Sequence, residues 1–474
     1  MNLQPLDIGI VIGYLVLTIL IGFLVSKRAN KNLDSYFLGG RSIPWYILGI
    51  SNASGMFDIT GTMWFASVIF VYGLKGAWMS WMWPIWNQIF LMIFLAAWLR
   101  RSGAMTGAEW LKTRFGEDRG SRLSHIIVVV FAIISVIGFI AYTFAGIGKF
   151  APSFFPWDLT TAVGSKVISS ENMYALLIMG FTSIYTIKGG MYSVVATEIM
   201  QYLVMIISCL IVGVIAMNLV TAQQLNAVIP IGWKDLFFGW KLNLDWSNLI
   251  PSVTNKIKVD GYEFFSVIFM IMIFKGILTS IAGPVPSYDL QRILSTKSPK
   301  DAARMTGFTS LVLFIPRFFM IAGFTVLVLV YFSPKLVAMG PGIDFEMVLP
   351  YAVSNFIPTG LLGILLCGLI AAFMSTYAAY VNAGPAYIVN DIYKKFINPN
   401  ASNKRYIHMS YFVSLVVVVI GIKGIGETTT KNLLTKYGSF QGVKEALEKD
   451  EKEFELDMGK KVTGILVKYF YDGF

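Results

Sequence analysis

Two adjacent hydroxyl residues in an apolar segment provide the clearest chemistry in this sequence. Ala372, Ser375 and Thr376 are spaced i, i+3 and i+4, which places them on one face of a helix. Their hydroxyls and a backbone carbonyl are oxygen ligands of the kind that a hard cation such as sodium prefers. Carbonyls released by a helix break near Asn52 would complete such a site. The alternative is that both hydroxyls bond carbonyls one turn back in their own helix.

The break is indicated by residues 51–61, which bring glycine and small hydroxyl residues into an apolar run, 45–71. A second apolar run, 264–288, is interrupted at 282–286 by glycine and two prolines. Such residues interrupt helices, and an unpaired backbone group in hydrocarbon is costly, so these breaks persist where the freed groups line a cavity. Two broken segments in corresponding halves of a chain are typical of a secondary transporter, with its binding site at the breaks.

Asp58 lies inside the first break, and a charge at the membrane centre costs about 2.5–3.5 kcal/mol. Ionisable residues at this depth are functional candidates, so Asp58 is expected to face a solute cavity. If it is charged and unpaired, it favours a cationic or amine-bearing solute. The alternative is a structural ion pair with Lys275 or Arg317.

The composition excludes an ordinary soluble chain, because 56% of the residues are hydrophobic, 14% are charged and the mean hydropathy is +0.66. A helix of about 20 residues crosses the hydrocarbon layer. We therefore predict an all-α, polytopic membrane protein with ten spans, at residues 5–26, 44–73, 77–100, 122–150, 172–187, 189–219, 262–283, 306–332, 359–389 and 405–422.

Basic residues set the expected orientation. With the N-terminus outside, 19 Lys and Arg residues fall in the inner connections and 8 in the outer ones, as the positive-inside rule requires. The N-terminal apolar segment has no basic region before it and no small-residue cleavage site, so we expect it to be retained as a span. These features predict a multi-pass protein of the cell's inner (plasma) membrane with an external N-terminus.

The order of the spans indicates an inverted repeat. The segments 44–219 and 262–422 each begin with a broken span, and an odd number of spans separates the two starts, so their orientations are opposite. No fifth span follows 405–422 in the second set. The last core helix is therefore predicted to be missing.

Four motifs resemble the sodium/solute symporter family, and they occur in the family's order. Residues 36–45 (YFLGGRSIPW) resemble the segment before the first core helix, and 189–201 resemble the fifth core helix. Residues 291–298 resemble the cytoplasmic stretch after the sixth helix, and 371–376 resemble the eighth. The resemblance covers about residues 5–421. It implies a LeuT-type inverted repeat with broken first and sixth core helices, and a sodium-coupled importer of a small organic solute working by alternating access, not an enzyme.

The resemblance also implies site residues. The coupling ion is sodium, and its implied ligands are Ile50, Ala53, Ala372, Ser375 and Thr376. The implied solute contacts come from the first and sixth core helices: Asn52, Ser54, Met56, Asp58 and Thr279. Glu198 replaces an aspartate that some relatives use for a second sodium, and a salt bridge at the cytoplasmic end suits its longer side chain better. The polar set of the sugar-transporting relatives is not reproduced, which argues against a sugar.

Composition changes abruptly after Gly421, where the chain becomes polar and rich in Lys and Glu. This tail resembles the helix-hairpin-helix end of the excision-repair nuclease UvrC. By that resemblance, Gly424, Gly426 and Gly459 would let backbone amides approach DNA phosphates. The alternative is a small helical hairpin with a solvated Lys/Glu face. We divide the chain into a membrane domain, 1–421, and a soluble tail, 422–474.

The expected topology delivers this tail to the outside, away from nucleic acid. The simplest account is a junction of unrelated genes at 421/422, which would leave the symporter truncated and inactive. Besides transport, the alternatives are a non-functional chimera carrying a DNA-binding module and a solute-sensing membrane protein. The predicted partners are sodium, a small solute and the lipid bilayer, with nucleic acid expected only through the tail.

Overall fold

The computed structural model describes residues 3–422, apart from 83, 156, 164–165, 238, 341–342, 346–355 and most of 265–287. Within this part the chain is mostly helical, with a single short hairpin of two antiparallel strands. Three predictions fall outside the described residues: the break at 282–286, the solute contact Thr279, and the tail with Gly424, Gly426 and Gly459.

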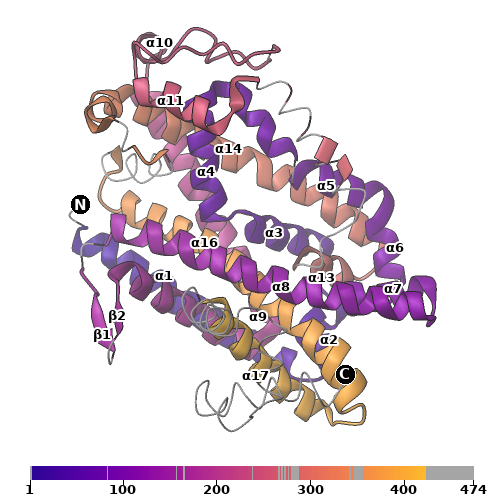
Figure 1. Ribbon diagram of the computed structural model, residues 1–474. Helices are drawn as coiled ribbons and strands as arrows, with labels where there is room; N and C mark the ends of the chain where they lie inside the picture. The colour runs from indigo at the N-terminus through magenta and orange to yellow at the C-terminus, as the bar shows by residue number, and fades with distance from the viewer. Residues whose placement is uncertain are drawn as a thin grey trace, which may run out of the picture.

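The long helices form one bundle, shown in Figure 1, and the short elements connect them. The bundle elements are α1 (Pro5–Ala29), α3 (Trp45–Met56), α4 (Ile59–Tyr72), α5 (Pro84–Phe90), α6 (Ala96–Arg101), α8 (Arg119–Phe150), α9 (Ser170–Leu219), α14 (Pro299–Met339), α16 (Leu361–Ala386) and α17 (Asn403–Gly421). The connecting elements are α2 (Leu33–Leu38), η1 (Gly39–Arg41), η2 (Gly73–Met82), η3 (Leu91–Leu95), α7 (Gly107–Phe115), η4 (Ala151–Ser153), β1 (Thr161–Val163), β2 (Lys166–Ile168), α10 (Ala222–Val228), α11 (Pro251–Asp260), η5 (Tyr262–Phe264), α13 (Tyr288–Ser295) and η8 (Tyr387–Ile397).

Six described helices are long and apolar enough to cross a membrane, and α3 with the helix after it forms a seventh, bent span. The two halves of that bent span meet at 64°. The predicted span 77–100 is not one regular helix. It is divided among η2, α5, the π-helical η3 and α6.

The first predicted break is real, but it lies one turn after Asn52. Helix α3 stays helical to Met56, and the chain leaves helical geometry at Phe57 and Asp58. Asp58 then starts α4, because its side chain accepts a hydrogen bond from the backbone N–H of Gly61. The sequence placed the interruption at the small residues, whereas the capping aspartate determines where it occurs.

Helix α9 contains two predicted spans, 172–187 and 189–219, joined at Gly190. The backbone of Gly190 has φ +49° and ψ −145°, a conformation that side-chain-bearing residues rarely adopt. A Cβ atom at this position would lie 2.4 Å from the carbonyl oxygen of Tyr36. Glycine therefore permits both the change of direction and the close contact with α2.

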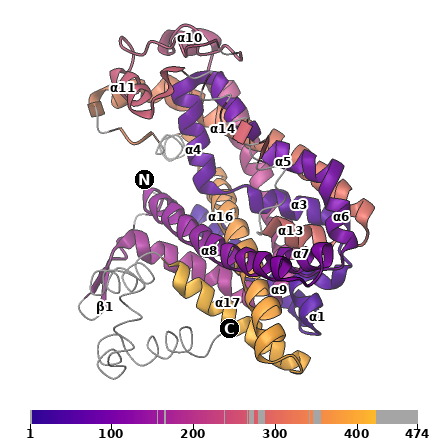
Figure 2. The same ribbon diagram turned by 45° about the vertical axis from the view of Figure 1, so that its right-hand side comes forward.

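The buried centre of the bundle is α16, which packs against α9, α1, α8 and α3. Figures 1 and 2 show α16 lying behind α8 and between the α3–α4 pair and α17. Helix α16 has no side-chain cap of its own at Gly360, and α1 supplies one. The Asp7 carboxylate accepts hydrogen bonds from the backbone N–H groups of Gly360 and Gly363 at 2.7 and 2.8 Å.

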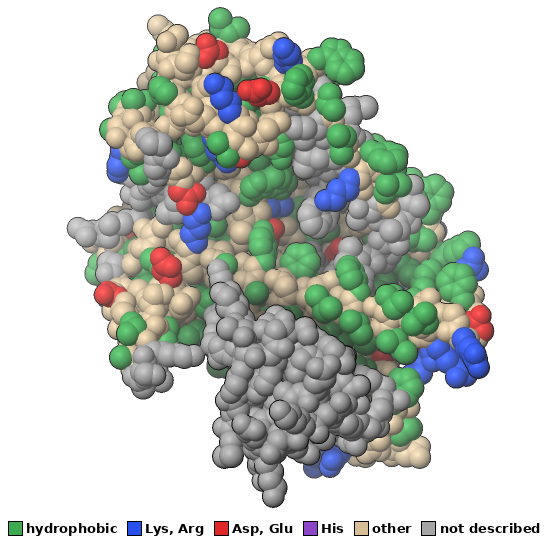
Figure 3. All heavy atoms as spheres, in the orientation of Figure 1, with side chains coloured by type: hydrophobic (Ala, Val, Ile, Leu, Met, Phe, Trp, Pro, Cys, Tyr) green, Lys and Arg blue, Asp and Glu red, His purple; other side chains and the backbone are tan. Residues whose placement is uncertain are grey.

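The outer surface suits a lipid environment along the helices. Large apolar side chains such as Leu24, Ile134 and Leu311 are more than half exposed on α1, α8 and α14. Figure 3 shows hydrophobic side chains covering much of the face along α8, with Lys and Arg side chains gathered at its α7 end. An apolar band with charges beyond it is the expected arrangement of a membrane protein.

Candidate functional site

The end of α3 meets α16 through a cluster of oxygen atoms. The Ser375 hydroxyl donates to the Ser54 carbonyl at 2.8 Å, and the Thr376 hydroxyl donates to the Gly55 carbonyl at 2.8 Å. The last carbonyls of a helix lack the usual partner one turn on, so they can accept bonds from elsewhere. The Ser54 carbonyl also accepts from the backbone N–H of Phe57 at 3.1 Å. The break after Met56 thus provides acceptors for the hydroxyls of another helix.

The two hydroxyls contact carbonyls of both helices. Besides the bonds to α3, each hydroxyl also contacts the Ala372 carbonyl one turn back, at 3.3 Å from Ser375 and 3.1 Å from Thr376. Five neutral oxygens therefore meet in a buried position, and they fit a hard monovalent cation. The described contacts involve the carbonyls of Ser54 and Gly55. Ile50 and Ala53 lie earlier on the same helix.

The predicted solute contacts differ in exposure. Asn52 and Ser54 are fully buried in α3, whereas Met56 is half-buried at its end. The Ser54 hydroxyl oxygen is buried with no hydrogen-bond partner among the described residues. Asp58 is also partly exposed, with 23% of its side chain accessible. Among the four, the two residues beside the break, Met56 and Asp58, are therefore the ones that are partly exposed in this conformation.

Asp58 is paired, so the condition for a cationic solute is not met. One oxygen, Oδ2, lies 3.6 Å from Nη2 of Arg317, and Oδ1 accepts a bond from the Tyr142 hydroxyl at 3.2 Å. Of the two partners that the sequence offered, the structure selects Arg317. Tyr142 was not predicted, because it lies on α8, far from Asp58 in sequence, and carries no motif.

Aromatic rings hold Arg317 beside the break. Its guanidinium carbon lies 5.6 Å from the Phe57 ring centre and 5.1 Å from the Phe65 ring centre. Its Nη1 donates to the Met56 carbonyl at 3.4 Å. Arg317 follows Pro316 inside α14, and its side chain is 6% exposed. The charge therefore sits at the carbonyl end of α3, where the helix dipole favours a cation.

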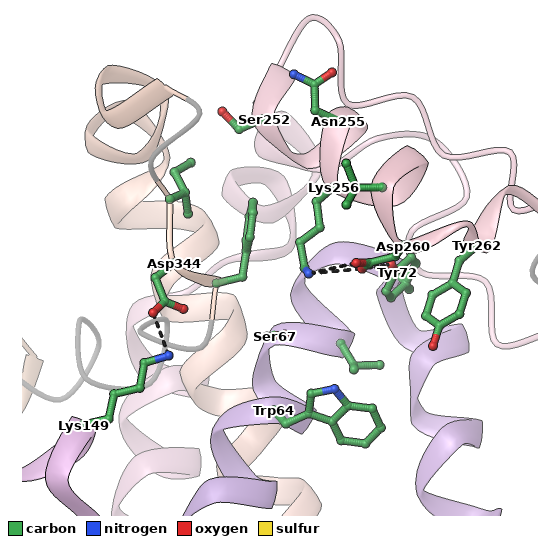
Figure 4. A pocket seen from close by; sticks show the side chains of 14 residues that line it. Trp64, Ser67, Tyr72, Lys149, Ser252, Asn255, Lys256, Asp260, Tyr262 and Asp344 are labelled. Carbon is green, nitrogen blue, oxygen red and sulfur yellow. Dashed lines mark hydrogen bonds and ion pairs between the residues drawn. The ribbon is translucent and has the colours of Figure 1, made fainter. Parts of the chain in front are cut away.

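A cavity of about 880 Å³ opens at the α11 end of the bundle. Figure 4 shows side chains from α4, α8, α11 and the 343–345 segment pointing into it. Lys149 pairs with Asp344 at 2.7 Å, and Lys256 pairs with Asp260 at 3.1 Å, each bridging part of the wall. Trp64 lines the cavity on α4, between these pairs and Asp58.

A buried ion pair lies at the α13 end of the bundle. Arg292 on α13 donates to the Glu198 carboxylate on α9, and Ser51 on α3 donates to the same carboxylate. Arg292 Nε also donates to the Ser51 hydroxyl at 3.0 Å. The Glu198 and Arg292 side chains are 0% and 1% exposed. The predicted salt bridge of Glu198 is confirmed, and its partner Arg292 lies in the 291–298 motif, whose structural role the sequence did not reveal.

Comparison with known proteins identifies the family. The model of the sodium:solute symporter family matches residues 36–444, which is most of the chain and extends past the 421/422 boundary. The sodium/glucose cotransporter 4 of Danio rerio is 24% identical over 91% of this chain, and the sodium/glucose cotransporter of Vibrio parahaemolyticus is 22% identical over 90%. The chain spans 64% of the length of the first protein and 77% of the second.

The fold agrees with this match. The substrate-bound, outward-open structure of a Na⁺-coupled sialic acid symporter superposes with a TM-score of 0.67 at 18% identity, over 91% of this chain and 82% of that one. The similarity confirms the predicted LeuT-type architecture, and the family match confirms the resemblance carried by the four motifs. With a family model matching well over half of its residues, the chain belongs to the sodium:solute symporter family.

Proposed function

We propose that this chain is a sodium-coupled secondary transporter that imports a small organic solute by alternating access. The observation that carries the proposal is the oxygen cluster between α3 and α16. A site of neutral oxygens joining a broken helix to a buried neighbour can hold sodium and lock the two helices together.

The cluster would bind the ion through Ala372, Ser375, Thr376 and carbonyls at the end of α3. Both hydroxyls now donate their hydrogens to carbonyls, so sodium binding would require the hydroxyl hydrogens to rotate away and leave the oxygen lone pairs on the ion. Ile50 and Ala53 remain predicted ligands from the resemblance. Their use would require α3 to shift relative to the Ser54 and Gly55 contacts.

The proposed orientation places the N-terminus and α11 outside. The cavity then faces outward and the Glu198–Arg292 pair lies toward the cytoplasm, which makes this an outward-facing conformation. Sodium entering from outside would stabilise the closed contact of α3 with α16. The membrane potential adds about 2.3 kcal/mol per charge per 100 mV to inward movement.

Sodium binding by the purified chain tests the proposal without knowledge of the solute. We expect sodium, but not an equal concentration of potassium, to raise the unfolding temperature of the detergent-solubilised protein. Ser375→Ala with Thr376→Val removes two ligands and should weaken the sodium response about tenfold or more.

The control variant is Ser410→Ala with Thr182→Val. These hydroxyls are also fully buried, but among the described contacts each bonds only a carbonyl of its own helix. Equal loss of the sodium response in both double variants, or no sodium response in the unchanged chain, contradicts the proposal.

A further inference from the structure

We propose that the transported solute is zwitterionic, with one cationic and one carboxylate group, and that Asp58 and Arg317 recognise its two charges. This inference rests on the proposed function, because it concerns the solute of the same transporter. Three features of the structure support it: the position of the pair, its partial exposure on helices that also line the cavity, and its electrical balance.

The pair occupies the point where the chain is interrupted. Asp58 caps α4, and Arg317 donates to the Met56 carbonyl at the end of α3, so one charge stands at each side of the break. Their closest described atoms are 3.6 Å apart, longer than the roughly 2.7–2.9 Å of a charge-assisted hydrogen bond. The two groups are thus neighbours at ion-pair distance.

The pair is partly accessible, because 23% of the Asp58 side chain is exposed. It shares two helices with the cavity, whose lining stops short of Asp58 and Arg317. Tyr142 and Lys149 are seven residues apart on α8, which places both on the same face, and Lys149 lines the cavity. On α4, Thr60, Trp64 and Ser67 share a face in the same way, and the last two line the cavity. Thr60 packs against Gly146, so the two faces meet between the cavity and the Asp58–Tyr142 contact.

The pair carries one negative and one positive charge, and this favours some classes of solute over others. A purely anionic solute at this point would face Asp58, and a purely cationic one would face Arg317, so each would meet a like charge at short range. A zwitterion presents an opposite charge to both groups and keeps the site neutral. A neutral polyol would need neither charge, and two charges at membrane depth are costly to retain.

The experiment is a binding screen on the purified full chain with and without sodium. The probes are neutral L-amino acids and glycine betaine, and for each amino acid its amide (a cation) and its 2-hydroxy acid (an anion). Glucose and myo-inositol serve as neutral polyols. Protection against thermal unfolding reports binding, and uptake into proteoliposomes then follows for the best ligand. We expect a zwitterion to protect more than its amide, its hydroxy acid and both polyols.

Charge removal should change the selectivity in opposite directions. Asp58→Asn keeps a capping side chain on α4 and should weaken zwitterion binding about tenfold or more while shifting preference toward the hydroxy acid. Arg317→Gln should weaken it similarly and shift preference toward the amide. The variant carrying both changes lacks both charges of the pair and should lose the preference for charged probes altogether.

The matched controls are Asp301→Asn and Arg304→Gln, which remove the charges of an Asp–Arg pair on the same helix, α14, where Arg304 is 50% exposed. They should leave the probe ranking unchanged. The inference is overturned if a polyol or a singly charged probe binds best, if no zwitterion binds, or if both single variants weaken every probe alike. Zwitterion binding without sodium dependence would instead overturn the proposed function and leave this inference standing.

Discussion

Glu198 and Arg292 show how strongly a single charge can matter in this bundle. Both side chains are excluded from solvent, and each depends on the other and on Ser51. Removing one partner of a buried ion pair leaves an uncompensated charge, which costs about 3–5 kcal/mol. We expect Glu198→Gln to destabilise the protein by that order, as measured by thermal unfolding in detergent.

The same helix provides the comparison. Glu171→Gln makes the same chemical change at an exposed position in the first turn of α9 and should change stability by less than about 0.5 kcal/mol. If the two variants unfold at the same temperature, the Glu198–Arg292 pair does not stabilise this conformation. Glu198→Gln should also expose the α13 end, because Arg292 then loses the carboxylate that holds it against α9.

At the scale of single residues, the sequence predicted that a residue forms an ion pair better than it predicted which residue is the partner. It indicated that Asp58 faces either a cavity or a counter-ion, and that Glu198 forms a salt bridge. It could not choose Arg317 over Lys275, or name Tyr142 and Arg292, because those contacts depend on how α8, α13 and α14 are placed around α3.

At the scale of an element, Gly190 determines the shape of helix α9. It lets α9 change direction between two spans, and it is the point at which the Tyr36 carbonyl of α2 approaches the helix. Gly190→Ala should cost about 1–3 kcal/mol from the backbone conformation alone, with a further cost from the Cβ contact at 2.4 Å. Thermal unfolding and the yield of monodisperse protein measure the loss.

Gly180→Ala on the same helix is the matched substitution. A Cβ there meets nothing within 4 Å, and its backbone is helical, so alanine should be neutral or stabilising by up to about 1 kcal/mol. A Gly190→Ala protein as stable as Gly180→Ala would show that α9 does not depend on the turn at Gly190.

The bounds of a helix could be predicted from sequence where the residues within the helix itself determine them. Apolar length located α1, α8, α16 and α17 within a few residues, whereas α14 extends seven residues beyond each end of the predicted span 306–332. The break in the first core helix was predicted over 51–61 from glycine and hydroxyl content, and the Asp58 cap fixes its position within that range. The span 77–100 reads as one helix by hydropathy, but the structure divides it. Pro84 is the first residue of α5, and α5, the π segment η3 and α6 pack against α14.

At the scale of the whole molecule, the two ends of the bundle are unlike each other. A large cavity with two surface ion pairs lies at the α11 end, and a buried ion pair with no such opening among the described residues lies at the α13 end. A transporter caught with one side open has this asymmetry. The distribution of Lys and Arg predicts that the α11 end faces the cell exterior.

Labelling with a membrane-impermeant thiol reagent on intact cells decides the orientation. Asn255→Cys on α11 and Asn403→Cys on α17 are the same substitution at two exposed positions near opposite ends. The native thiols Cys209 and Cys367 are buried and should react slowly. We expect Asn255→Cys to react in intact cells and Asn403→Cys only after the cells are permeabilised. The reverse pattern would place the cavity in the cytoplasm and make this conformation inward-facing, and sodium would then reach the α3–α16 cluster from the wrong side for uptake.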